Sequence, residues 1–153
     1  MQFGGLLAGA EVAAVLSQGP ADVQAALASY GRHLGTAYQL MDDVLDYRSN
    51  PSARGKNLGD DLAEGKPTLP LIHALKHGDD SQRAAIRRAI KSGGLIELDA
   101  VVAAIEATGG LDYAQRAAET ESELALAALS VLPGSSYKEG LMSLAQFAVE
   151  HTT

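Results

Sequence analysis

The chain has 153 residues, of which 46% are apolar and 20% charged, a balance that is typical of one globular domain and argues against wholesale disorder. Twelve basic residues against 19 acidic ones give a formal net charge of −7, which disfavours nucleic acid as a partner because an acidic surface repels phosphate backbones. The absence of cysteine excludes a disulfide framework, thiolate metal sites and a cysteine nucleophile.

The first predicted helix covers residues 3–16 and is the most apolar stretch of the chain. It is too short to cross a bilayer, which takes about 20 apolar residues, and it contains Glu11. It also begins without a capping Ser, Thr or Asp, so we expect the first residues of the sequence to belong to the middle of a longer helix. With no basic leader in front of it, the chain is predicted to be cytoplasmic and to have no transmembrane segment.

Helix-forming residues also dominate the remainder, and strand-like alternation is absent, which predicts an all-α protein with roughly seven helices. The second helix is expected from about Ala21 to Arg48, after the Gly19-Pro20 break. Residues 50–65 are punctuated by glycine and proline and are predicted to be irregular. A loop of that length in a compact domain is usually functional or disordered.

Five further helices are predicted after this loop. They are expected over residues 67–77, 80–91, 98–108, 111–132 and from 136 to near the C-terminus, separated by glycine and proline pairs. Pro67 suits the first turn of its helix, and Asp80-Ser81 is expected to cap the next one. Ser135 or Ser136 is expected to cap the last helix, with a capping box possible from Ser136.

The C-terminal half of the second helix carries the strongest chemical signal. Apolar residues lie on two of its faces, which predicts that the helix is buried. Yet four polar residues share one stripe, at i, i+3, i+4 and i+7, and they are Gln39, Asp42, Asp43 and Asp46. Three neighbouring carboxylates repel one another, and a buried charge is costly without a partner, so a cation is expected against them. Mg²⁺ suits this set, because it takes one or two carboxylates and completes its shell with water and substrate phosphates. Lysines, or a solvated acidic face, are the alternatives.

The loop that follows supplies positive charge. Lys56 and Lys66 each have a glycine directly before them, and glycines let the backbone approach a ligand closely. Ordinary solvation is the alternative for any single loop lysine. Two such lysines after three aspartates favour a clamp for a diphosphate.

These motifs resemble those of the trans-prenyl diphosphate synthases. Residues 39–46 resemble the second aspartate-rich motif (DDxxD) of that family, and residues 55–62 and 64–71 resemble the conserved loop after it. Across nearly all of the chain, the sequence is most similar to the bacterial octaprenyl diphosphate synthases. The similarity covers only the C-terminal half of the family. Residues 1–153 are therefore expected to be the C-terminal portion of a single polyprenyl synthase domain, with the N-terminal portion, including the first aspartate-rich motif, absent.

The resemblance implies a helical bundle of the isoprenoid synthase type and the activity of a prenyltransferase. Such enzymes use Mg²⁺ to condense isopentenyl diphosphate head-to-tail onto an allylic diphosphate, here to octaprenyl diphosphate for a quinone side chain. The resemblance also implies a homodimer for the complete protein. The isolated chain is expected to be inactive, because half of the metal site lies in the missing portion.

The resemblance also assigns roles to individual residues. The implied metal ligands are Asp42, Asp43 and Asp46, with Asp42 the main one. The implied contacts to the substrate diphosphate are Gln39, Lys56 and Lys66, of which Lys56 is catalytic together with the three aspartates, and Asp61 supports them.

Other interpretations remain open. Another all-α, Mg²⁺-dependent terpenoid enzyme, such as a terpene cyclase, is disfavoured by the two lysines. A non-catalytic subunit of a two-component synthase, or a helical scaffold with a solvated acidic stripe, is also compatible with the sequence. His73 and His77 stand at i and i+4, but Ala74 replaces the glutamate of a zincin motif, so a partly exposed helix end is favoured there.

Overall fold

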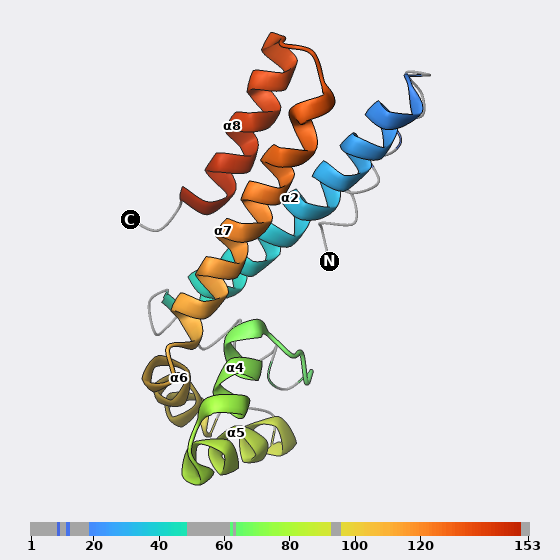
Figure 1. Cartoon of the computed structure of the whole chain (residues 1–153). Coiled ribbons are helices and arrows are strands. Elements are labelled where there is room, and N and C mark those ends of the chain that lie inside the picture. Colours follow the sequence, from blue (N-terminus) through green and yellow to red (C-terminus); the bar gives the residue numbers. More distant parts are fainter. Residues whose placement is uncertain are drawn as a thin grey trace. The chain divides into compact units, whose positions relative to one another are not determined.

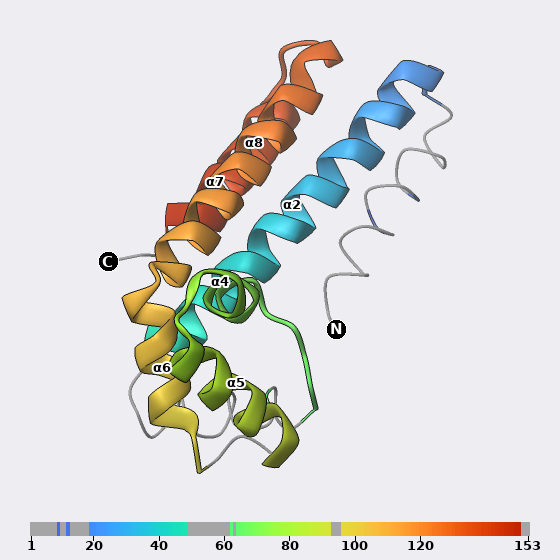
Figure 2. The same ribbon diagram turned by 60° about the horizontal axis from the view of Figure 1, so that its bottom comes forward.

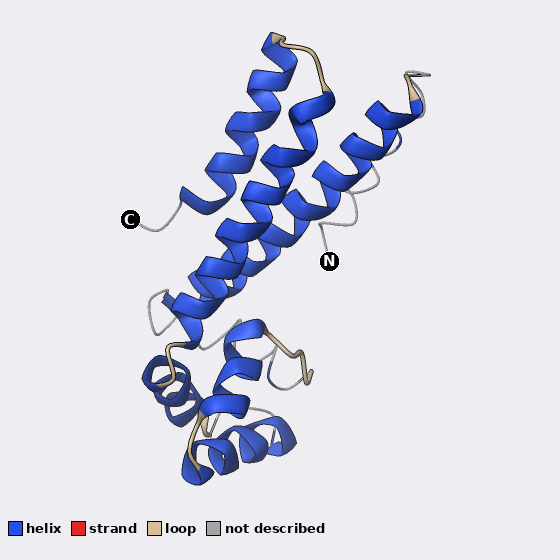
Figure 3. Cartoon of the chain, viewed as in Figure 1, coloured by secondary structure: helices blue, strands red, loops and turns tan. Residues whose placement is uncertain are grey.

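The computed structural model describes residues 9, 12, 19–48, 62, 64–92 and 96–150, and within these ranges it contains helices and turns but no strand (Figure 3). This confirms the all-α prediction. The helices are α2 (Ala21–Arg48), α4 (Leu69–His77), α5 (Asp80–Ser92), α6 (Leu98–Ala107), α7 (Gly110–Ala128) and α8 (Ser136–Glu150), with a short 3₁₀ helix, η1 (Leu129–Val131), directly after α7 (Figure 1). Over the described ranges, none of these helices combines the length and the apolar character that crossing a membrane requires.

Helix α2 begins and ends where it was predicted, but several other helix ends and caps differ. Helix α4 begins at Leu69 instead of 67, because Thr68 is its N-cap and Pro70 stands in its first turn. Helix α5 is capped by Asp79, not by Asp80-Ser81. The Gln82 N–H donates to Asp79 Oδ1 at 2.8 Å, and the Asp79 N–H donates to Gln82 Oε1 at 2.9 Å.

At the other end of the chain, helix α7 stops at Ala128, where η1 takes over, instead of continuing to residue 132. Helix α8 is capped by Ser135, whose Oγ accepts the Lys138 N–H at 3.2 Å. Most of the predicted helix over residues 3–16 lies outside the described residues, although Gly9 and Val12 are helical. The same holds for most of the predicted loop over residues 50–65. Leu62, however, is helical and buried, so the prediction of an irregular backbone was wrong at that position.

The chain divides into two compact units, each with its own core. The terminal unit comprises Met1–Met41 and Arg116–Thr153, and it includes parts of α2 and α7 together with η1 and α8. Its core is formed mainly by small side chains and a few large ones, namely Tyr30, Leu34, Ala37, Ala125, Leu129, Ala145 and Ala148. The Tyr30 hydroxyl donates to the Leu141 carbonyl at 2.8 Å, and the buried Ser122 hydroxyl donates to the Ala145 carbonyl at 2.6 Å. These bonds fasten α2 and α7 to α8, which lie side by side in Figure 1.

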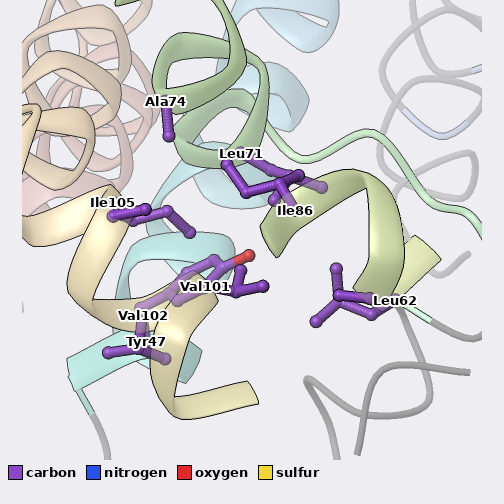
Figure 4. Close-up of a cluster of buried hydrophobic side chains, with 10 residues drawn as sticks. Tyr47, Leu62, Leu71, Ala74, Ile86, Val101, Val102 and Ile105 are labelled. Atoms are coloured by element: carbon purple, nitrogen blue, oxygen red, sulfur yellow. The ribbon is translucent and has the colours of Figure 1, made fainter. Parts of the chain in front are cut away.

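The central unit comprises Asp42–Gln115 and contains α4, α5, α6, the end of α2 and the start of α7. Helices α4, α5 and α6 pack on one another (Figure 2). Figure 4 shows the larger side chains of their core, namely Tyr47, Leu62, Leu71, Ile86, Val101, Val102 and Ile105. Gly110 starts α7 close to α4, since a Cβ there would lie 2.8 Å from the Pro70 carbonyl oxygen. Only glycine permits this approach without a shift of one helix.

Candidate functional site

The acidic row lies near the C-terminal end of α2. Gln39 and Asp42 are exposed, and Asp43 and Asp46 are half-buried. The apolar faces of the helix had predicted that the row is buried. In the structure, the row is only partly buried. The reason is visible in the neighbours: Met41, Val44 and Tyr47 are 2%, 0% and 3% exposed and take up the core-facing side of the helix. The row follows the border between this side and solvent, where a carboxylate can meet both water and a ligand.

The pKa of the Asp42 carboxyl is raised above its ordinary value, first by the burial of that carboxyl and second by the nearby charge of Asp46. Although much of Asp42 is exposed, the surrounding protein removes part of the water that would stabilise its negative charge. Asp46 stands one turn further along the same helix and adds repulsion. The pair thus holds more negative charge than the helix stabilises well, which favours binding of a cation.

The segment before α4 places Lys66 in a chain of tight turns. Gly65 has a φ of +67°, and its N–H donates to the Leu62 carbonyl at 3.1 Å. Two residues further, the Thr68 N–H donates to the Lys66 carbonyl, also at 3.1 Å. The Lys66 ammonium lies 3.2 Å from Glu64 Oε2, and both side chains are more than half exposed. An exposed ion pair of this kind is weak, so a ligand with greater negative charge can compete for the lysine.

A hydrogen bond connects this segment to α2. The Tyr47 hydroxyl lies 3.2 Å from Thr68 Oγ1, and the ring of Tyr47 is buried in the core of the central unit. Tyr47 directly follows Asp46, and Thr68 stands two residues after Lys66. Sequence analysis missed this pair, because Tyr47 fits an apolar face and Thr68 falls inside the helix that was predicted to begin at residue 67. The adjacency of each residue to a predicted site residue was the available signal.

Two of the predicted site residues, Lys56 and Asp61, lie outside the described residues. His73 and His77, in contrast, are well defined. Their rings lie 4.4 Å apart, and the His73 ring is stacked on Tyr113 at 4.5 Å. His73 Nε2 is 3.1 Å from the Thr108 carbonyl oxygen. One ring nitrogen of His73 is thus engaged by the backbone, which agrees with a packing role for this histidine of α4.

In the ranges that the structure describes, no group of three His, Cys, Asp or Glu side chains is arranged to hold a metal ion. Mg²⁺ does not require one, since it uses one or two protein carboxylates and takes its other ligands from water and phosphate. The donors here are oxygen atoms only, which suits Mg²⁺. Burial first, and the nearby charge of Asp46 second, raise the pKa of the Asp42 carboxyl. The residues present therefore fit Mg²⁺ bound jointly with a phosphate ligand.

Comparison with known proteins gives consistent matches. The family model described as polyprenyl synthetase matches residues 5–107, which is more than half of the chain. The octaprenyl diphosphate synthase of Haemophilus influenzae is 51% identical over 141 residues, which are 92% of this chain and 43% of that relative. The corresponding enzyme of Escherichia coli is 46% identical over 144 residues, which are 94% of this chain and 45% of that relative.

Solved structures agree with the sequence matches. A polyprenyl synthase from Caulobacter crescentus, complexed with calcium and isoprenyl diphosphate, superposes with a TM-score of 0.83 at 35% identity and covers 97% of this chain and 46% of that one. A polyprenyl synthase from Roseobacter denitrificans superposes with a TM-score of 0.82 at 37% identity and covers 95% and 48%. The chain spans less than half the length of the curated relatives it matches. The extent of the family match and the identity to these relatives establish that the chain belongs to the polyprenyl synthetase family.

Proposed function

We propose that the chain is the C-terminal portion of a polyprenyl diphosphate synthase and supplies the second aspartate-rich motif of its active site. The reaction is the head-to-tail condensation of isopentenyl diphosphate onto an allylic diphosphate. Identity of 51% and 46% to octaprenyl diphosphate synthases supports an octaprenyl product. The complete enzyme would act as a homodimer in the cytoplasm, and the isolated chain would be inactive because it holds only part of the metal site.

The observation that carries this proposal is the acidic row on α2, which lies at the border between the core-facing side of the helix and solvent. Asp42 has a raised pKa because of burial and the charge of Asp46. In a member of a family whose substrates are diphosphates, such a row suits Mg²⁺ and the substrate together. The calcium and isoprenyl diphosphate of the Caulobacter crescentus relative support a divalent cation and a diphosphate as joint ligands.

The proposal assigns a task to each of the predicted site residues. Asp42, Asp43 and Asp46 would hold Mg²⁺, directly or through water. When bound, Mg²⁺ supplies charge that stabilises the diphosphate as it leaves the allylic carbon. Gln39 would donate its amide N–H groups to a diphosphate oxygen, while Lys56 and Lys66 would neutralise the remaining charge. Asp61 would orient the lysines.

Replacement of a relative's matching segment by this chain tests the proposed activity. The 144-residue match in the Escherichia coli enzyme defines the segment to exchange. We expect the chimera to form long-chain polyprenyl diphosphate, and we expect Asp42→Ala to reduce turnover roughly 100-fold, because transition-state charge stabilisation is lost. Glu123→Ala, which removes an exposed carboxylate of α7, is the matched control and should leave turnover unchanged.

Four outcomes would count against the proposal or one of its parts. An inactive chimera beside an active parent enzyme would speak against the synthase function, and full turnover of Asp42→Ala would remove Asp42 from the mechanism. If calorimetry shows no linked binding of Mg²⁺ and pyrophosphate to the chimera or to the isolated chain, the acidic row is a solvated face. Mg²⁺-dependent elongation by the isolated chain would overturn its expected inactivity.

A further inference from the structure

Thr68 occupies a capping position but does not cap. It is the N-cap of α4 with extended backbone angles (φ −73°, ψ 149°), and its side chain makes no bond to the first turn of the helix. A threonine at this position ordinarily accepts a hydrogen bond from the N–H of the second or third helical residue. The second helical residue here is Pro70, which has no N–H. The Thr68 hydroxyl is instead hydrogen-bonded to the hydroxyl of Tyr47.

Tyr47 is a rigid anchor for this bond. Its side chain is only 3% exposed and belongs to the core cluster that also contains Leu62. A buried ring with two torsions loses little further freedom when its hydroxyl binds a partner. The same core therefore holds both ends of the segment between Leu62 and Thr68, one through a buried leucine and the other through the Tyr47 hydroxyl.

Lys66 lies between these two fixed ends. The Gly65 N–H bond to the Leu62 carbonyl closes the turn before it, and the Thr68 N–H bond to the Lys66 carbonyl closes the turn after it. With both flanking turns closed, the direction in which the Lys66 side chain leaves the backbone is restricted. A charge that is held in place before its ligand arrives loses less conformational entropy on binding.

The bond also attaches this segment to α2, the helix that carries the acidic row. Tyr47 follows Asp46 in sequence and stands four residues after Asp43, so it shares a helix face with that carboxylate. We infer that the Tyr47–Thr68 hydrogen bond positions Lys66 at the end of the acidic row for capture of a diphosphate, which makes Tyr47 and Thr68 positioning residues. This inference rests on the proposed function, since the diphosphate is the ligand assigned to Lys66 there.

Two variants of the full 153-residue chain test this inference. Tyr47→Phe and Thr68→Val each remove one partner of the bond and keep the shape of the side chain. We expect each to weaken the Mg²⁺-dependent binding of pyrophosphate about 3- to 10-fold in calorimetry, which is the range for the loss of one hydrogen bond. We also expect faster hydrogen exchange at the Gly65 and Thr68 amides, because the turns around Lys66 would open more often.

Matched controls separate positioning from general stability. Tyr30→Phe removes the hydroxyl of another tyrosine that is 3% exposed, one that bonds to a backbone carbonyl in the terminal unit. It should lower the thermal stability of the chain by a similar amount and leave pyrophosphate affinity and the two exchange rates unchanged. Thr68→Ser keeps the hydroxyl and should retain the affinity of the unaltered chain.

Each result leads to a definite conclusion. If Tyr47→Phe binds pyrophosphate as tightly as the unaltered chain, or exchanges the Gly65 and Thr68 amides no faster than Tyr30→Phe, the positioning role is overturned. If the unaltered chain does not bind pyrophosphate with Mg²⁺, the ligand assignment of the proposed function fails for this chain. The exchange measurement still decides in that case whether Tyr47 orders the Lys66 segment, so the two failures are distinguishable.

Discussion

The terminal and central units build their cores from different residues. Four of the seven buried residues that form the terminal cluster are alanines, whereas the central cluster relies on larger, mostly branched side chains such as Ile86, Val101 and Ile105. Alanine lets two helix backbones approach closely, and the hydroxyls of Tyr30 and Ser122 then reach carbonyls of α8. The central unit joins shorter helices through turns and fills the space between them with large side chains.

Most of the described residues of the candidate site lie in the central unit. The carboxylates Asp42, Asp43 and Asp46 and the lysine Lys66 belong to the central unit, and Lys66 lies in the turns that precede α4. Gln39 belongs to the terminal unit. Turns present backbone and side-chain groups that a continuous helix keeps engaged, which is why binding residues often lie on them. Close helix contacts in the terminal unit leave less room for such groups.

The largest effect is expected from a cavity in the central core. Ile105 is fully buried, and Ile105→Ala should lower the free energy of unfolding by about 3 kcal/mol, since it removes buried methyl groups and leaves a void. Urea denaturation measures the change. Ile96→Ala, at a side chain that is 88% exposed, should change stability by less than about 0.5 kcal/mol. Equal losses for both variants would mean that the central core is not packed as described.

In the terminal unit, the alanine-rich contact between helices predicts that a larger side chain, and not a smaller one, lowers the free energy of unfolding. Ala125 is fully buried on α7, and Ala125→Leu should cost about 2 kcal/mol because the helices must separate or the side chain must adopt a strained rotamer. Ala127→Leu, two residues further and exposed, should be nearly neutral. A stable Ala125→Leu variant in thermal unfolding would show that α7 does not require close contact.

The buried Tyr30 of the terminal unit should make the stability of the chain fall at alkaline pH. Burial, and to a smaller extent the neighbouring Tyr38, raises the pKa of Tyr30 to about 12. In the unfolded chain a tyrosine ionises near pH 10. The neutral form is thus favoured by folding, and its contribution to stability is complete below pH 10 and is lost as the pH rises toward 12. By pH 11, the unaltered chain should lose about 1 kcal/mol relative to Tyr30→Phe. Parallel pH profiles of the two proteins would contradict this.

The smallest effect concerns the acidic row. The pKa of Asp42 is raised in the folded state, so its ionised form opposes folding at neutral pH. Asp42→Asn should therefore stabilise the chain at pH 7 by a few tenths of a kcal/mol, as expected for relief of one like-charge pair on a helix. The gain should shrink as the pH falls through the raised pKa and be absent below about pH 4, where the carboxyl is neutral in both states. A constant difference across this pH range would point to a cause other than charge.

Much of the fold could be predicted because its signals are local. Gly19-Pro20 sets the start of α2, and the composition after it excludes strands over the described ranges. The helix ends that were wrong involve competing caps: Asp79 bonds Gln82 and so prevails over Asp80 and Ser81. Leu62 was predicted to lie in a loop because glycine and proline surround its segment, and a contact with a distant core is not visible in such a pattern.

What the sequence by itself determined is the all-α class, the course of α2 and the grouping of Gln39, Asp42, Asp43 and Asp46 on one stripe, since a helix repeats every 3.6 residues wherever it lies. Tertiary structure alone decided how much water reaches each carboxylate and which residue anchors the Lys66 segment. Both depend on residues far apart in the chain, as when Tyr47 meets Thr68 across 21 positions. Local periodicity places side chains around one helix axis, but packing between helices decides which partners and how much solvent they meet.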